Sequence, residues 1–122
     1  MMGAMPFRFS REGDVLVIVA DGIIRSEDVP TLRETEQRFF ADNPKVALFL
    51  CDCLDMKIIS PEARDELAHL MRQDNPIIKK SAYVIGEGTA ALQLRRMFRE
   101  VGTDKRRLFN SRDDALAWLH EK

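Results

Sequence analysis

The sequence has few cysteines, few aromatic residues and almost no net charge. Its 122 residues include two cysteines, one tryptophan and one tyrosine, and 19 basic residues face 20 acidic ones, for a net charge of −1. Nucleic-acid-binding proteins usually carry a clear basic excess, so we expect no nucleic-acid partner. No apolar run is long enough to cross a bilayer, which predicts no membrane insertion. Residues 1–5 lack the basic flank and apolar core of a signal peptide, so we expect a cytoplasmic protein with a disordered or loosely ordered start.

The two cysteines, Cys51 and Cys53, flank Asp52 in a predicted central strand. Alternation along a strand places both side chains on the same face. Residues two apart on one strand are poorly placed to form a disulfide, because their side chains run parallel at the limit of disulfide reach. The sequence has no third cysteine, and both histidines lie far away along the chain. We therefore predict two buried, reduced thiols, no metal site and no cofactor.

Short apolar runs alternate with amphipathic segments along the chain. Strand-length runs separated by helix-length segments indicate parallel strands joined by helical crossovers. An alternating segment at 7–9, followed by a turn at 11–14, indicates that the first two strands form a hairpin. At 45% hydrophobic and 32% charged residues, the chain is typical of a single globular domain, which we place at 6–122. The apolar runs are Val15–Val19, Val46–Cys51, Ala82–Ile85 and the shorter Leu108–Phe109.

Four hydroxyl residues mark expected helix starts: Ser26, Ser60, Thr89 and Ser111. The resulting order is ββαβαβαβα, an α/β fold with four helices and a mostly parallel sheet. We expect the second strand to end at Asp21-Gly22, a third strand at 45–53, and a connection at 54–59. The second helix is expected to end at Asn75-Pro76. The third helix is expected to bury Leu92, Met97, Phe98 and Val101.

Ser60 stands between a predicted buried strand and a helix start, with Pro61 directly after it. Ser at the N-cap and Pro at the first helical position form a specific start signal. The hydroxyl is therefore interpreted as a plain helix cap, or alternatively as a phospho-acceptor or anion-binding position, since a helix N-terminus favours negative charge. The preceding apolar residues Met56, Ile58 and Ile59 are interpreted as cover for the core or as the rim of a cavity.

A basic patch is predicted at Arg95, Arg96, Arg99 and Arg106. We interpret this patch as a solvated helix face or, alternatively, as a docking surface for an acidic partner or an anionic lipid head. The spacing supports neither a Ser-His-Asp nor a Cys-His arrangement, so we name no catalytic residue and expect no enzyme.

Several local patterns together resemble the STAS superfamily, in particular its SpoIIAA-like (STAS/SEC14-like) bacterial branch. The patterns cover most of the chain: Val17–Ile24 before a Ser-initiated helix, Leu48–Asp52, Ile58–Ala63, Leu108–Ser111 and Asp114–Leu119. The resemblance implies a four- or five-stranded mixed sheet with helices largely on one side.

Anti-sigma-factor antagonists of that superfamily carry a phosphorylated serine in an Asp-Ser-Ser-Gly sequence at the second helix. Here the corresponding stretch is Ile59–Ala63, in which Ser60 aligns with the Asp and Pro61 with the acceptor, so the motif is missing. The resemblance implies a regulatory or protein-interaction module that acts through the start of the second helix, with a protein partner or a second copy of the chain. The alternative is a small apolar or anionic, lipid-like ligand held in a cavity between the sheet and the helices. The residues expected to line that cavity or to form an interaction surface are Met56, Ile58, Ile59, Pro61, Leu92 and Phe98.

Overall fold

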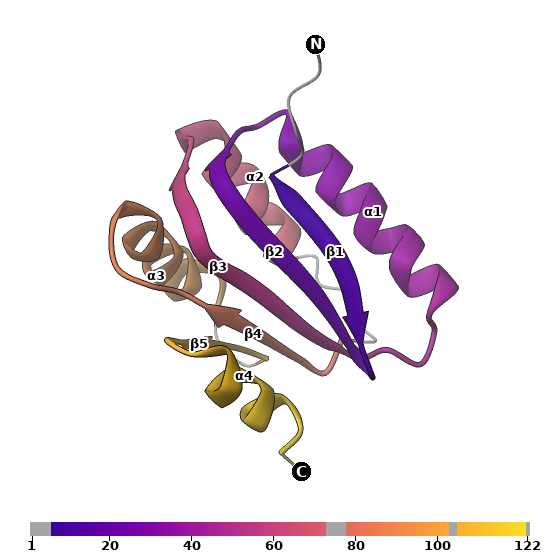
Figure 1. The fold of residues 1–122 in the computed structure, drawn as a ribbon. Helices are drawn as coiled ribbons and strands as arrows, with labels where there is room; N and C mark the ends of the chain where they lie inside the picture. Colours follow the sequence, from indigo (N-terminus) through magenta and orange to yellow (C-terminus); the bar gives the residue numbers. More distant parts are fainter. Residues whose placement is uncertain (1–5, 73–77, 103–104, 122) are drawn as a thin grey trace.

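The structure, a computed structural model, describes residues 6–72, 78–102 and 105–121. The described residues form one five-stranded mixed sheet in the order β1-β2-β3-β4-β5 (Figure 1). β1 runs antiparallel to β2, and the other neighbours are parallel. The strands are β1 (Phe7–Glu12), β2 (Val15–Ile24), β3 (Leu48–Ile59), β4 (Lys80–Val84) and β5 (Arg106–Phe109).

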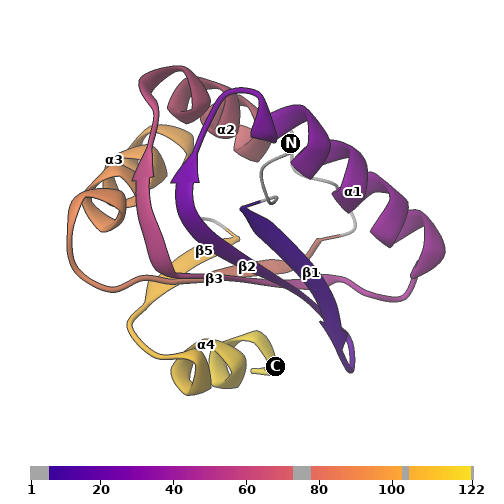
Figure 2. The same cartoon turned by 45° about the horizontal axis from the view of Figure 1, so that its top comes forward.

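In the described part of the chain, four helices cover the two faces of this sheet unequally. They are α1 (Asp28–Asp42), α2 (Pro61–Arg72), α3 (Thr89–Val101) and α4 (Arg112–Leu119). Figure 2 shows α1, α2 and α3 on one face and α4 alone on the other. The larger core lies under the three helices and the smaller one under α4. The predicted element order, the hairpin and the mixed sheet are confirmed.

The central strands form because their residues suit a sheet that is buried on both faces. Residues 15–18 of β2 are all buried, and they alternate between the two cores: Leu16 and Ile18 face α1–α3, while Val15 and Val17 face α4. β-Branched and other aliphatic residues on both faces are typical of parallel strands covered by helices.

The ends of β2 and β3 differ from the prediction. The second strand does not end at Asp21-Gly22, and residues 54–59 are not a connection, because β2 and β3 stay paired as far as Ile24 and Ile59. β3 also begins at Leu48, three residues later than expected. Register shifts interrupt the pairing after Val19 and again after Gly22. Such bulges break the period-two alternation, which is why the sequence pattern indicated an early end.

Two of the predicted helix caps are confirmed. Ser60 Oγ accepts a hydrogen bond from the Ala63 N–H at 3.2 Å, and Ser111 Oγ accepts one from the Asp114 N–H at 3.1 Å. Each bond satisfies a backbone donor in the first turn of a helix.

The other two predicted caps are wrong. α1 has Glu27 at its N-cap without a side-chain cap bond, because the Ser26 hydroxyl bonds the Glu66 carboxylate on α2 instead. α3 has Gly88 at its N-cap, with a φ of 112°, a conformation that glycine adopts readily. Thr89 is then the first residue of the helix. The predicted end of α2 at Asn75-Pro76 lies outside the described residues.

The predicted buried side of α3 is partly wrong. Met97 and Phe98 are buried as expected, but Leu92 is 59% exposed. The buried stripe instead begins with the small residues Ala90 and Ala91. The prediction followed the largest apolar side chains, whereas the 100° turn per residue places Leu92 away from the stripe. No helix in the described part of the chain has the length and hydrophobicity needed to cross a membrane.

Candidate functional site

The carboxyl ends of β2 and β3 extend past the rest of the sheet. β4 ends at Val84, opposite Asp52 of β3, so the last part of β3 pairs with β2 alone. The side chain of Gln93 on α3 occupies the open edge of β3. The Ile59 N–H donates to Gln93 Oε1 at 2.8 Å, and Gln93 Nε2 donates to the Ile59 carbonyl at 2.6 Å. The amide thus replaces a neighbouring strand at this position.

Exposed apolar side chains lie on this extension and on α3. Within the described residues, the exposed large hydrophobic side chains are Ile23 (42%), Leu54 (49%), Ile58 (40%) and Leu92 (59%). Three come from the ends of β2 and β3, and the fourth lies beside Gln93 on α3. We call these four residues the apolar ledge.

The pairing of β2 with β3 explains two members of the ledge. Ile23 pairs with Ile58, and Ile24 pairs with Ile59. Ile24 and Ile59 point into the larger core and are almost fully buried, so Ile23 and Ile58 share the opposite face of the sheet. α4, the helix on that face, packs against residues earlier in the strands, such as Val17 and Leu50. The end of this face is therefore left uncovered by α4.

Ser60 lies at the junction of β3 and α2. Its N–H donates to the Ile24 carbonyl at 2.9 Å, and its hydroxyl caps α2 as described above. The side chain is half-buried, and the neighbouring Pro61 is exposed. The structure therefore assigns the hydroxyl a capping bond, while a role as phospho-acceptor or anion-binding residue stays a prediction.

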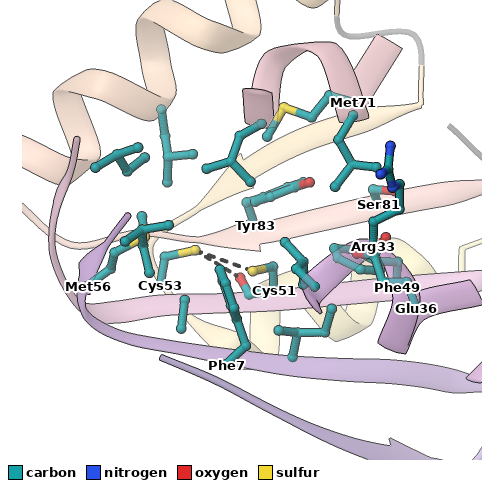
Figure 3. A pocket seen from close by; sticks show the side chains of 18 of the residues that line it. Phe7, Arg33, Glu36, Phe49, Cys51, Cys53, Met56, Met71, Ser81 and Tyr83 are labelled. Carbon is teal, nitrogen blue, oxygen red and sulfur yellow. Dashed lines mark hydrogen bonds between the residues drawn. The ribbon is translucent and has the colours of Figure 1, made fainter. Parts of the chain in front are cut away.

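A cavity of about 380 Å³ lies between the sheet and helices α1 and α2 (Figure 3). Most of its lining is apolar, and Arg33, Glu36 and Gln37 of α1 contribute polar groups. Of the residues predicted to line a cavity or to form an interaction surface, Met56 and Ile59 line this cavity. Ile58, Pro61 and Leu92 are exposed instead, and Phe98 lines a different hollow.

Cys51 and Cys53 both line this cavity and are both buried free thiols, which confirms the predicted state of the cysteines. Figure 3 shows both side chains pointing from β3 into the cavity. Their Sγ atoms are 3.5 Å apart. The hydrogen bond with Cys53, followed by burial, raises the pKa of the Cys51 thiol well above its ordinary value. In the described residues, no group of three or more His, Cys, Asp or Glu side chains is arranged to hold a metal ion.

Of the four residues of the predicted basic patch, Arg95, Arg99 and Arg106 line one hollow. Arg95, Arg96 and Arg99 are exposed on α3, but Arg106 is buried. Its guanidinium donates to the Gly102 carbonyl at 3.2 Å and to the Met71 carbonyl. A buried guanidinium needs such acceptors, so Arg106 holds together the chain near the ends of α2 and α3. Arg106 therefore lines the hollow as a buried, hydrogen-bonded guanidinium, and a docking role for the patch stays a prediction.

Sequence reasoning missed Ile23, Leu54 and Gln93. The available signal was a pair of isoleucine doublets, Ile23-Ile24 and Ile58-Ile59, each just before a helix. In both doublets the second residue is buried and the first is exposed. No local pattern indicates Gln93, because its partner lies 34 residues away.

Neither a scan against protein-family models nor a search of curated proteins gave a match. Solved structures do match. An uncharacterised protein from the DUF3478 family with a SpoIIAA-like fold, from Shewanella loihica PV-4, has a TM-score of 0.68 at 21% identity and covers 93% of this chain and 91% of its own. An anti-sigma factor antagonist from Mycobacterium paratuberculosis has a TM-score of 0.68 at 19% identity, covering 94% and 93%. The unphosphorylated anti-sigma factor antagonist SpoIIAA has a TM-score of 0.64 at 11% identity, covering 91% and 94%.

Proposed function

Given that this chain has the SpoIIAA-like fold of the STAS superfamily, we propose that it is a non-enzymatic regulatory module that binds a protein partner through the apolar ledge and the start of α2. The pairing of the exposed Ile23 with the exposed Ile58, on a face whose end α4 leaves uncovered, carries this proposal. Two proteins of the same fold are named as anti-sigma factor antagonists, which is consistent with a regulatory role.

The surface chemistry of the ledge suits a protein partner. Contiguous exposed apolar side chains rimmed by polar ones mark interaction sites on soluble proteins. Here the rim is supplied by exposed charged residues beside the ledge, Asp55, Lys57 and Glu62. Burying one isoleucine or leucine side chain contributes about 1.5–3 kcal/mol when it was fully exposed, and less for these partly exposed ones. Four such side chains supply the apolar centre of an interface, and the charged rim supplies specificity.

Ser60 gives this surface a position for regulation. It sits at the N-terminus of α2, next to Ile58 and Ile59 in sequence. A phosphate on its hydroxyl would add negative charge at the positive end of the helix and beside the ledge, which changes the surface that a partner meets. We therefore keep Ser60 as the candidate phospho-acceptor of the module.

The proposal is tested by affinity capture from cells of the source organism with wild-type protein, Ile58→Lys and the control Arg38→Glu. Ile58 belongs to the ledge, and Arg38 is exposed on α1. We expect a partner that the wild type and Arg38→Glu retain and that Ile58→Lys loses. Equal recovery with all three proteins rules out the ledge as the docking surface. Sedimentation of the purified protein identifies the case in which the partner is a second copy of the chain.

A second candidate function is the binding of a small apolar or lipid-like molecule in the cavity under α1 and α2. The specific observation is the cavity volume of about 380 Å³, which lies in the range of small-molecule sites. Native mass spectrometry of freshly purified protein tests it. Ala20 lines the cavity, so the variant Ala20→Leu reduces its volume and is expected to lose a molecule that the wild type retains. A wild type without any retained molecule, or equal retention by the variant, contradicts this candidate.

A further inference from the structure

The paired sulfur atoms in the cavity are a feature that neither proposed function uses. Cys51 and Cys53 lie on the same face of β3, 3.5 Å apart at Sγ, and both line the cavity. Cys53 Sγ also lies 3.8 Å from the Cys51 carbonyl oxygen. The strand fixes the spacing of the two residues, so a ligand that enters the cavity can contact both sulfur atoms at once (Figure 3).

The surroundings of the pair decide which ligand it suits. A structural zinc ion requires four ligands, and in the described residues no group of three or more His, Cys, Asp or Glu side chains is arranged to hold a metal ion. A two-coordinate complex of a monovalent metal ion with two thiolates carries net negative charge, which is costly to bury among apolar side chains. The hydrogen bond with Cys53, followed by burial, also raises the pKa of the Cys51 thiol and so keeps it protonated. A suitable ligand therefore reacts with a neutral Cys51 thiol and leaves a neutral product.

From this geometry we infer that Cys51 and Cys53 form a chelating site for a monosubstituted trivalent arsenical, with its organic substituent in the cavity. In water such a compound is R–As(OH)₂. Each thiol transfers its proton to one hydroxyl group, two As–O bonds break, two As–S bonds form, and two water molecules leave. Arsenic stays trivalent, so no oxidant or reductant is needed, and the product R–As(S-Cys)₂ is uncharged.

The fit is favourable on both sides of the arsenic atom. Trivalent arsenic is pyramidal with narrow bond angles, so it holds two sulfurs about as far apart as they already lie here. The third substituent then points away from β3 into a cavity of about 380 Å³ lined mainly by apolar side chains. Tyr83 and Phe49, whose ring centroids are 5.8 Å apart, offer aromatic contacts to an aryl group there. This inference shares the cavity of the second candidate function but rests on the two sulfurs.

Phenylarsine oxide is the probe, and intact-protein mass spectrometry is the readout. We expect the wild type to take up one phenylarsenic group, to keep it in a large excess of the monothiol glutathione, and to release it to dimercaptopropanol. The matched controls Cys51→Ser and Cys53→Ser each keep one thiol in a nearly isosteric site. Their retention is expected to be weaker by about 100-fold or more, because one of two linked contacts is lost.

A further variant separates this inference from the second candidate function. Ala20→Leu keeps both thiols but reduces the cavity, so it should lose phenylarsine oxide and keep the smaller methylarsenous acid. Thermal unfolding of each variant confirms that it is folded. The inference is overturned if the folded wild type takes up no arsenical, or if either single serine variant retains it as strongly as the wild type. Uptake of the arsenical by a protein that retains no other apolar molecule supports this site while contradicting the second candidate.

Discussion

Gln93 and Ile59 form a closed pair in which the side-chain amide of one residue satisfies both backbone groups of the other. The two bonds measure 2.8 Å and 2.6 Å, and they link the first half of α3 to the last residue of β3. A strand edge that ends without a neighbour exposes backbone donors and acceptors. The amide closes this edge and so links Ile59, the neighbour of Ile58, to α3, the helix that carries Leu92.

We predict that Gln93→Ala lowers the free energy of unfolding by about 1–3 kcal/mol, because two partly buried backbone groups lose their partners. Gln93→Glu keeps a carboxylate acceptor for the Ile59 N–H but has no donor for the Ile59 carbonyl. Its free energy of unfolding should therefore lie between that of the wild type and that of Gln93→Ala. Urea unfolding followed by circular dichroism measures both. Equal stability of wild type and Gln93→Ala shows that the amide does not support the edge.

The capping role of Ser60 predicts a specific rescue. Ser60→Ala removes the acceptor for the Ala63 N–H and should cost about 1 kcal/mol. Ser60→Asp keeps an oxygen acceptor at the N-cap and should restore most of that stability. The matched control Ser111→Ala removes the equivalent bond on α4. Thermal denaturation of the three variants is the measurement, and a Ser60→Asp protein no more stable than Ser60→Ala contradicts the cap.

The ion pair between His120 and Asp14 predicts a pH dependence of stability. Their hydrogen bond of 2.9 Å raises the pKa of His120 above 6.5 and lowers the pKa of Asp14 below 3.8. The histidine contribution is fully present below 6.5 and is lost as pH rises through its raised pKa. The aspartate contribution is present above 3.8 and is lost as pH falls through its lowered pKa. The pair therefore stabilises most between these two values.

His120→Ala should remove this dependence. Both side chains are largely exposed, so the effect stays below about 1 kcal/mol and shrinks with added salt. The measurement is the melting temperature from pH 4 to pH 9 for wild type, His120→Ala and Asp14→Asn. If the difference between wild type and the variants is constant over this range, the ion pair does not contribute.

The burial of Arg106 predicts a contrast with its exposed neighbour Arg95. Arg106→Gln replaces the buried guanidinium, which donates to the Met71 and Gly102 carbonyls, with a shorter and uncharged side chain. Bonds from charged donors contribute about 1.5–3 kcal/mol, so the loss should be of that order. Arg95→Gln, on the exposed face of α3, should change stability by less than about 0.5 kcal/mol. Chemical denaturation distinguishes the two, and equal effects contradict a structural role for Arg106.

The core of the fold could be predicted because its signals are local. Continuous apolar runs such as Val15–Val19 indicate buried parallel strands, and Ser60-Pro61 marks a helix start. The errors arise where a distant residue decides the local structure. The Glu66 carboxylate accepts a hydrogen bond from the Ser26 hydroxyl, which therefore does not cap α1. The pairing of β2 with β3 continues through two bulges.

The candidate site was less predictable, because exposure depends on the final packing. Residues 58 and 59 are both isoleucines, so the residue type does not distinguish them. The pairing of the strands decides that Ile58 is exposed and Ile59 is buried. The cavity likewise arises from the way α1 and α2 sit on the sheet, which no run of residues encodes. The proximity of Cys51 and Cys53, in contrast, follows from strand alternation alone.

The affinity of the captured partner for wild type, Ile58→Lys and Arg38→Glu tests the docking surface most directly. Ile58 belongs to the proposed interface, so a lysine there should weaken binding by about 2 kcal/mol or more, roughly 30-fold in the dissociation constant. The Arg38→Glu protein should bind like the wild type, and all three should unfold at similar temperatures. Equal affinities for the three proteins would mean that partners are recognised elsewhere on the molecule.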